Sequence, residues 1–145
     1  MAEAIAAFGL AANIVQFIDF GCNFVSTVWS IYRKGRDGVG ELFDLEKTTK
    51  DLQLVLANLQ LPPGNPDERT ESERSLQELA EQCQNLATEM LNALRQISNP
   101  DKPRKRDALK TAFRMIWKED EIKSQQLRLE GFKHHLTLHL LTSLR

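Results

Sequence analysis

The sequence predicts an all-α protein, a single domain over residues 1–145 that forms a mostly antiparallel four- to five-helix bundle. Three observations predict this fold. The first 32 residues contain no proline and only two charged side chains, Glu3 and Asp19. The later segments repeat apolar residues every three or four positions, which is the period of a helix face. Prolines and glycines separate these segments, and no alternating run indicates a strand.

The first predicted helix, residues 2–33, is long and apolar except for one narrow polar stripe. Its strongly polar residues recur at intervals of three or four, which places them on one face: Asn13, Gln16, Asp19, Asn23, Ser26 and Ser30. A helix apolar around the rest of its circumference is normally buried. We therefore expect it to be the central rod of the bundle, or to kink near Gly21. Its uncharged stretches fall short of the roughly 20 residues that a membrane span needs.

The second helix is predicted over residues 41–59, after a connector that contains three glycines. Glu46 and Lys50 are expected to pair on its exposed side, because residues four apart are neighbours on a helix. Pro62 and Pro63 end the helix, since proline cannot continue the backbone hydrogen bonds. Its predicted core positions are Leu45, Leu52, Leu56 and Leu59.

The third helix is predicted to begin at a capping box formed by Thr70 and Glu73. It has the clearest two-sided pattern in the chain and is expected to cover one side of the first helix. Its predicted core positions are Leu76, Leu79, Cys83, Leu86, Met90, Leu94 and Ile97.

The last segment, residues 104–145, is predicted to be helical with a bend or short break near residues 118–120. The apolar register changes there, because the charged run Lys118 to Glu121 separates two stripes. The first stripe is Leu109, Phe113, Ile116 and Trp117, and the second is Ile122, Leu129, Phe132, Leu136, Leu140 and Leu144.

Composition argues against several classes of function. A formal net charge of −1 does not suit a general nucleic-acid binder. Cys22 and Cys83 fall on apolar helix faces, and we expect them to be buried, reduced thiols of a cytoplasmic protein. No nucleophile, base or ligand set indicates an enzyme or a cofactor. His135 and His139 have a spacing that could bind a metal, but with no acidic partner they are interpreted, with His134, as ordinary side chains.

A basic cluster before the last helix has two interpretations. It consists of Lys102, Arg104, Lys105, Arg106 and Lys110. Such a run is usually a solvated face that pairs with a neighbouring acidic segment. Alternatively, it binds anionic lipid headgroups, an attraction of about 1 kcal/mol per basic residue near a negative membrane.

Several stretches together resemble the HeLo-like N-terminal domain of fungal NOD-like receptors, the NACHT-type STAND proteins. The resemblance is carried by Met1 to Gly21, Ile31-Tyr32, Asp44 to Glu46, Asp51-Leu52, Ile116 to Ile122, Leu127 to Leu129 and Leu136 to Arg145. It implies a helical effector module of fungal innate immunity, related to the executioners of heterokaryon incompatibility. It also implies that NACHT-type receptor domains follow Arg145 in the parent protein.

This resemblance leads to two hypotheses. In the first, the domain triggers regulated cell death: receptor oligomerisation brings like domains together, and the N-terminal helix leaves a cytoplasmic bundle to enter the plasma membrane. The membrane-inserting residues would be Ile5, Phe8, Leu10, Ile14, Val15, Phe17 and Ile18, the polar stripe Asn13, Gln16, Asp19 and Asn23 would line an assembly, and the basic cluster would bind anionic lipids. In the second, the domain is a homotypic protein–protein interaction module without a membrane role.

Overall fold

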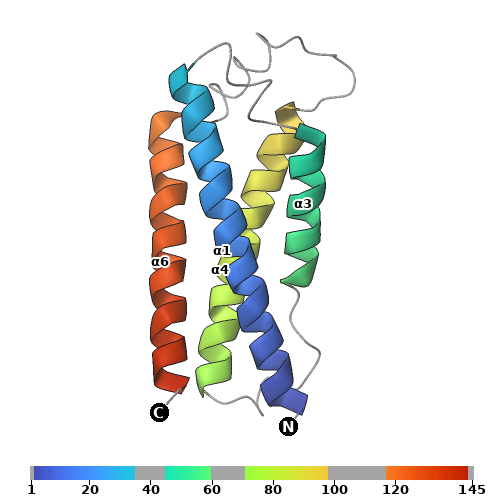
Figure 1. Ribbon diagram of the computed structural model, residues 1–145, viewed down its shortest axis with the longest axis vertical. Helices are drawn as coiled ribbons and strands as arrows, with labels where there is room; N and C mark the ends of the chain where they lie inside the picture. The colour runs from blue at the N-terminus through green and yellow to red at the C-terminus, as the bar shows by residue number, and fades with distance from the viewer. Residues whose placement is uncertain (1, 35–44, 60–70, 98–116, 144–145) are drawn as a thin grey trace.

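The computed structural model describes residues 2–34, 45–59, 71–97 and 117–143. These residues form four α-helices: α1 (Ala2–Lys34), α3 (Leu45–Asn58), α4 (Glu71–Ile97) and α6 (Glu119–Ser143). The helices run alternately up and down, with both chain ends at the same end of the bundle (Figure 1). The predicted all-α, mostly antiparallel bundle is confirmed.

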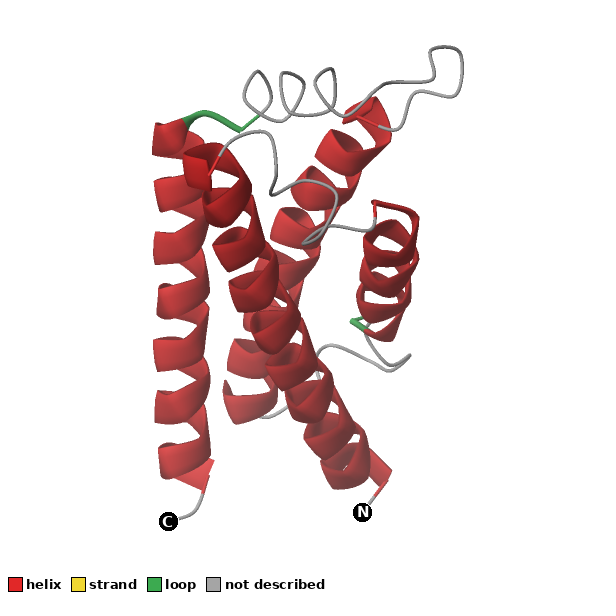
Figure 2. Ribbon diagram, turned by 45° about the horizontal axis from the view of Figure 1, so that its top comes forward, coloured by secondary structure: helices red, strands yellow, loops and turns green. Residues whose placement is uncertain are grey.

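Helices α1 and α4 form the centre of the bundle, and each of them contacts the other three helices. The short helix α3 lies on one side of this central pair and α6 lies on the other (Figures 1 and 2). Helix α1 is a single helix of 33 residues that continues through Gly21. The expected central rod is therefore correct, and α1 is unbroken at Gly21; the expected kink there stays a prediction.

One continuous apolar core joins the four helices. The predicted core positions of α4 are all buried, apart from Ile97, whose side chain is outside the described part. Leu52 of α3 and Leu59, directly after the helix, are buried. Leu56 is half-buried, Val55 also faces the core, and the side chain of Leu45 lies outside the described part. The predicted pair on the exposed side of α3 is present, because Lys50 Nζ lies 3.1 Å from Glu46 Oε1.

The change of register in the last segment coincides with the start of α6. Trp117 and Lys118 precede the helix, and the Ile122 amide donates to the Lys118 carbonyl at 3.0 Å. The buried Trp117 ring meets Phe24 of α1 edge to face, with 5.4 Å between the ring centroids. The rest of the first predicted stripe, Leu109, Phe113 and Ile116, lies outside the described residues.

The second stripe of α6 is buried from Ile122 through Leu136 at the predicted positions. Leu140 is a correction, because it is 41% exposed, and the predicted position Leu144 lies outside the described residues. Cys22 is a second correction: it is exposed, whereas Cys83 is buried as expected. The reason is its spacing, three residues after Asp19 and four before Ser26, which places the thiol at the edge of the polar stripe.

Candidate functional site

The polar stripe of α1 faces outward along most of its length. Gln16, Asp19 and Asn23 are exposed. Asn13 is half-buried, because its Nδ2 donates a hydrogen bond of 2.9 Å to the backbone carbonyl of Asn58 at the end of α3. One member of the predicted stripe therefore attaches α1 to its neighbour, while the other three meet water.

The apolar side chains of α1 that were singled out for membrane insertion lie mostly inside the bundle. Leu10, Ile14, Phe17 and Ile18 are buried, and Ile14 and Phe17 have no exposed surface. Val15 is different, because 42% of its side chain is exposed beside the polar stripe. The side chains of Ile5 and Phe8 are outside the described part of the chain. The bundle shields most of this apolar surface from water.

By length and composition alone, one stretch of α1 could cross a membrane. This stretch is Gly9–Arg33, 25 residues with a mean hydropathy of 1.3. It is long and apolar enough for a membrane span even though it contains the charged Asp19. The central helix of a soluble bundle has the same properties, and 44% of the most apolar window is buried in the protein. The apolar character of α1 is thus compatible with both a protein core and a bilayer.

A groove of about 630 Å³ runs between α1 and α6. At one end the Arg33 guanidinium lies 4.7 Å from the centre of the Trp29 ring, and Trp29 Nε1 donates to Gln126 Oε1 at 3.4 Å. Lys123 also lines this end, and its Nζ lies 3.3 Å from Glu119 Oε1. The groove combines aromatic surface with cationic groups that already have partners within the protein.

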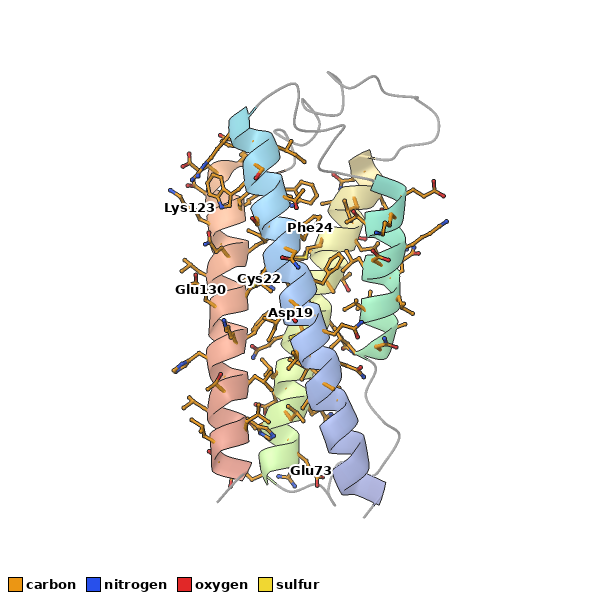
Figure 3. The ribbon with its side chains drawn as sticks, in the orientation of Figure 1. Asp19, Cys22, Phe24, Glu73, Lys123 and Glu130 are labelled. Atoms are coloured by element: carbon orange, nitrogen blue, oxygen red, sulfur yellow. The ribbon has the colours of Figure 1, made fainter. Side chains whose placement is uncertain are left out.

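Cys22 and Glu130 also line the groove (Figure 3). Burial raises the pKa of the Cys22 thiol, and the positive charge of Lys133 partly opposes this effect. Asp19 and Glu130 raise the pKa further. A thiol activated for nucleophilic chemistry has a lowered pKa, so this environment works against such a role.

The histidines of α6 do not come together as a site. His134 is exposed, and His135 Nε2 lies 3.1 Å from Ser75 Oγ of α4. Burial lowers the pKa of His139, and the neighbouring His135 adds to the effect. Within the ranges that the structure describes, no three His, Cys, Asp or Glu side chains are grouped so that they could hold a metal ion.

The basic cluster Lys102, Arg104, Lys105, Arg106 and Lys110 lies outside the described residues. Its two interpretations therefore remain predictions. The same holds for the Thr70 half of the capping box, although α4 does begin directly after it, at Glu71.

The sequence analysis missed an apolar strip on the outer face of α6, made of Leu127, Leu138 and Leu141. These side chains are exposed, and they lie on the side of α6 opposite its buried stripe. At 100° per residue the three leucines form a second apolar face of α6, opposite the one from which its core positions are predicted.

The described helices therefore define a class of protein: an antiparallel α-helical bundle with an apolar central helix and without a metal cluster in the described residues. None of the protein-family models, curated proteins or solved structures compared with the chain matches it.

Proposed function

We propose that the chain is a HeLo-like effector domain of a fungal NOD-like receptor and that it triggers cell death by attacking the plasma membrane. Receptor oligomerisation brings several domains together. Helix α1 then leaves the bundle and inserts its apolar surface into the bilayer. In the resting state the domain is cytoplasmic, with no enzymatic activity and no cofactor.

The observation that carries this proposal is the burial of an unusually apolar α1 among helices that it contacts mainly through apolar side chains. Exposing a buried side chain such as Phe17 to water costs about 1.5–3 kcal/mol. The hydrocarbon of a bilayer is as apolar as the core, so insertion offsets this cost, whereas release into water does not. The free-energy cost of releasing α1 is therefore smaller at a membrane than in water.

The polar stripe sets a condition on the inserted state. A charged group such as Asp19 is costly in hydrocarbon, and intramembrane polar residues face a protein interior or a water-filled space. Several inserted copies of α1 can meet this condition if Gln16, Asp19 and Asn23 face one another. Oligomerisation is thus part of the proposed mechanism.

The experiment is to lock α1 to α6 with an engineered disulfide. A Cβ at Gly21 would lie 3.5 Å from Leu129 Cγ, so Gly21→Cys/Leu129→Cys joins the two helices at a point of close contact. The Cys22→Ser substitution in the same protein removes the exposed native thiol. Dye leakage is then measured from vesicles that contain anionic lipid, with the oxidised and the reduced protein.

We expect no leakage from the oxidised protein and leakage at the level of the Cys22→Ser parent after reduction. Circular dichroism of both forms verifies that the bundle is intact. Equal leakage from both forms, or no leakage from the parent, would overturn the membrane proposal. Lys105→Glu/Arg106→Glu in the unlocked protein tests the headgroup role, and we expect reduced vesicle binding with no change in fold.

A second candidate function is a homotypic interaction module whose α1 never leaves the bundle. The exposed strip on α6 favours it, because isolated apolar side chains are ordinary on a surface but an aligned set indicates a contact surface. In this case the locked protein keeps its full activity in self-association.

A further inference from the structure

The C-terminal end of α3 is bound by side-chain amides from two other helices. Asn13 Nδ2 of α1 donates to the Asn58 carbonyl at 2.9 Å. Gln84 Nε2 of α4 donates to the next carbonyl, that of Leu59, at 2.6 Å. The last carbonyls of a helix have no partner within it, and the helix dipole makes this end negative. The two amides and the two carbonyls that they bind form what we call the amide clamp.

Helix α3 has few other attachments to the core. Among its described side chains, Leu52 and Val55 are buried, and the buried Leu59 follows directly after the helix. A helix of 14 residues is marginal by itself in water. The Leu59 amide also donates to the Leu56 carbonyl at 3.1 Å, which closes the last turn beside the amide clamp. The position of α3 therefore depends on the amide clamp as well as on a small set of apolar contacts.

The amide clamp also connects the two central helices, because Asn13 belongs to α1 and Gln84 to α4. Burial of apolar surface is non-directional, so it does not by itself fix the position of one helix along another. A hydrogen bond does, since it requires a defined distance and angle. Through the end of α3, the amide clamp therefore fixes α1 relative to α4 at the level of Asn13.

We infer that the amide clamp is an autoinhibitory contact that keeps α1 in the bundle. Release of α1 breaks the hydrogen bond of Asn13 and frees its amide for the polar stripe of the inserted assembly. Loss of the Gln84 hydrogen bond lets the end of α3 move with α1, so that α3 no longer ties α1 to α4. The inference deepens the proposed function by naming what restrains α1, and it rests on that function for its biological setting.

Amide hydrogen exchange of the full chain in buffer without lipid, followed by NMR, measures the opening of α1. An element that opens separately exchanges faster than amides that require global unfolding. We expect α1 amides, such as that of Phe17, to exchange through an opening that leaves α4 protected. Gln84→Ala should accelerate this exchange about fivefold, the effect of one hydrogen bond. The acceleration is expected in α1 although Gln84 lies on α4.

Two further substitutions at position 84 separate hydrogen bonding from packing. Gln84→Glu retains the length of the side chain, but its carboxylate cannot donate, so it should behave like Gln84→Ala. Gln84→Lys retains a donor and places a positive charge at the negative end of α3, so it should exchange like the parent. The matched control is Ser75→Ala, which removes a 3.1 Å contact between α4 and α6 and should leave the exchange of α1 unchanged.

A double variant tests whether the two hydrogen bonds act as one connection. Asn13→Ala alone should accelerate exchange of α1 about as much as Gln84→Ala does. The double variant should add little to either, because the loss of one bond already breaks the connection. Two independent bonds would multiply to about 25-fold, and this result would overturn the inference. A parent in which α1 and α4 exchange only together, by global unfolding, would overturn it as well.

Dye leakage from anionic vesicles separates this inference from the proposed function. If both are correct, Gln84→Ala should leak at about fivefold lower protein concentration than the parent, because a larger fraction is competent for insertion. Faster exchange of α1 in this variant without leakage from the parent would support the amide clamp and overturn the membrane proposal. Leakage from the parent, with exchange of α1 that does not respond to Gln84→Ala, would do the reverse. Circular dichroism verifies that each variant is folded.

Discussion

Gly21 of α1 faces Leu129 of α6 so closely that no other residue fits there without movement. A Cβ at Gly21 would lie 2.7 Å from Leu129 Cδ2 and 3.2 Å from Cδ1. Leu129 is itself buried, with 1% of its surface exposed, so its methyl groups have little room to turn away. The missing side chain at Gly21 thus leaves room for the methyl groups of Leu129 at this contact between α1 and α6.

The first prediction compares the same substitution at two glycines, each in the middle of a helix. Gly131→Ala should stabilise the protein by up to about 1 kcal/mol, because alanine has the higher helix propensity and the position is open. Gly21→Ala gains the same propensity but overpacks the core, which costs about 1–3 kcal/mol. We expect a net loss of about 1 kcal/mol, measured by urea unfolding. A Gly21→Ala protein as stable as Gly131→Ala would show that α6 moves aside freely.

The bundle could be predicted from the sequence because periodicity reports which face of a helix is buried. The predicted core positions of α4 from Leu76 to Leu94 are all buried, because α4 has a single apolar face and that face packs against the core. The start of α6 after Trp117 was indicated by the charged run that separates two registers.

The sequence does not determine what packs against each apolar helix face: another helix of the bundle, water or a further partner. Cys22 sits at the edge of the stripe, where a shift of one position decides between core and water, and it is exposed. The outer leucines of α6, such as Leu127, follow the same period as its core residues. Periodicity cannot distinguish the face that a bundle covers from one that a further partner would cover. The site residues of α1 are ambiguous for the same reason, because a core and a bilayer select the same side chains.

The second prediction concerns the thiols. In the folded protein at pH 8, a thiol reagent should modify only Cys22, and more slowly than a free cysteine, because its pKa is raised by burial. Cys83 should react only on unfolding, since burial raises its pKa to about 12. Cys22→Ser should remove all reaction of the native protein. Fast modification of two thiols without denaturant would contradict this assignment.

Cys83 also makes stability depend on pH. Its ordinary pKa is about 8.5, so above this pH the unfolded thiol loses its proton while the folded one keeps it. The unfolded state then binds fewer protons, and the free energy of unfolding falls as pH rises from about 8.5 toward about 12. Cys83→Ala should flatten this part of the profile relative to the parent, at the expense of a lower stability at neutral pH.

The third prediction concerns the acid side. Burial and the neighbouring His135 lower the pKa of His139, so the folded state resists its protonation. As pH falls through the ordinary histidine value of about 6.5, the unfolded state binds the proton first and stability decreases. His139→Gln should reduce this slope between about pH 5 and 7 in urea unfolding. A slope as steep as that of the parent would contradict the assignment.

The last prediction separates the two tryptophans. Trp117 is 2% exposed, packs on Phe24 and lies where the chain enters α6, so Trp117→Ala should lower the free energy of unfolding by about 3–5 kcal/mol. Trp117→Phe retains an aromatic ring beside Phe24 and should cost less than half as much. Trp29 is half-buried at the open groove between α1 and α6, so Trp29→Ala should cost about 1–2 kcal/mol, a typical value outside the core.

Urea unfolding followed by far-ultraviolet circular dichroism measures all three variants without depending on tryptophan fluorescence. The order expected is Trp117→Ala, then Trp117→Phe and Trp29→Ala with smaller losses. If Trp29→Ala cost as much as Trp117→Ala, the half-buried Trp29 would contribute as much to stability as the buried Trp117. Opening the bundle along the α1–α6 boundary would then cost more than the loss of the buried contacts there, and release of α1 would be correspondingly harder.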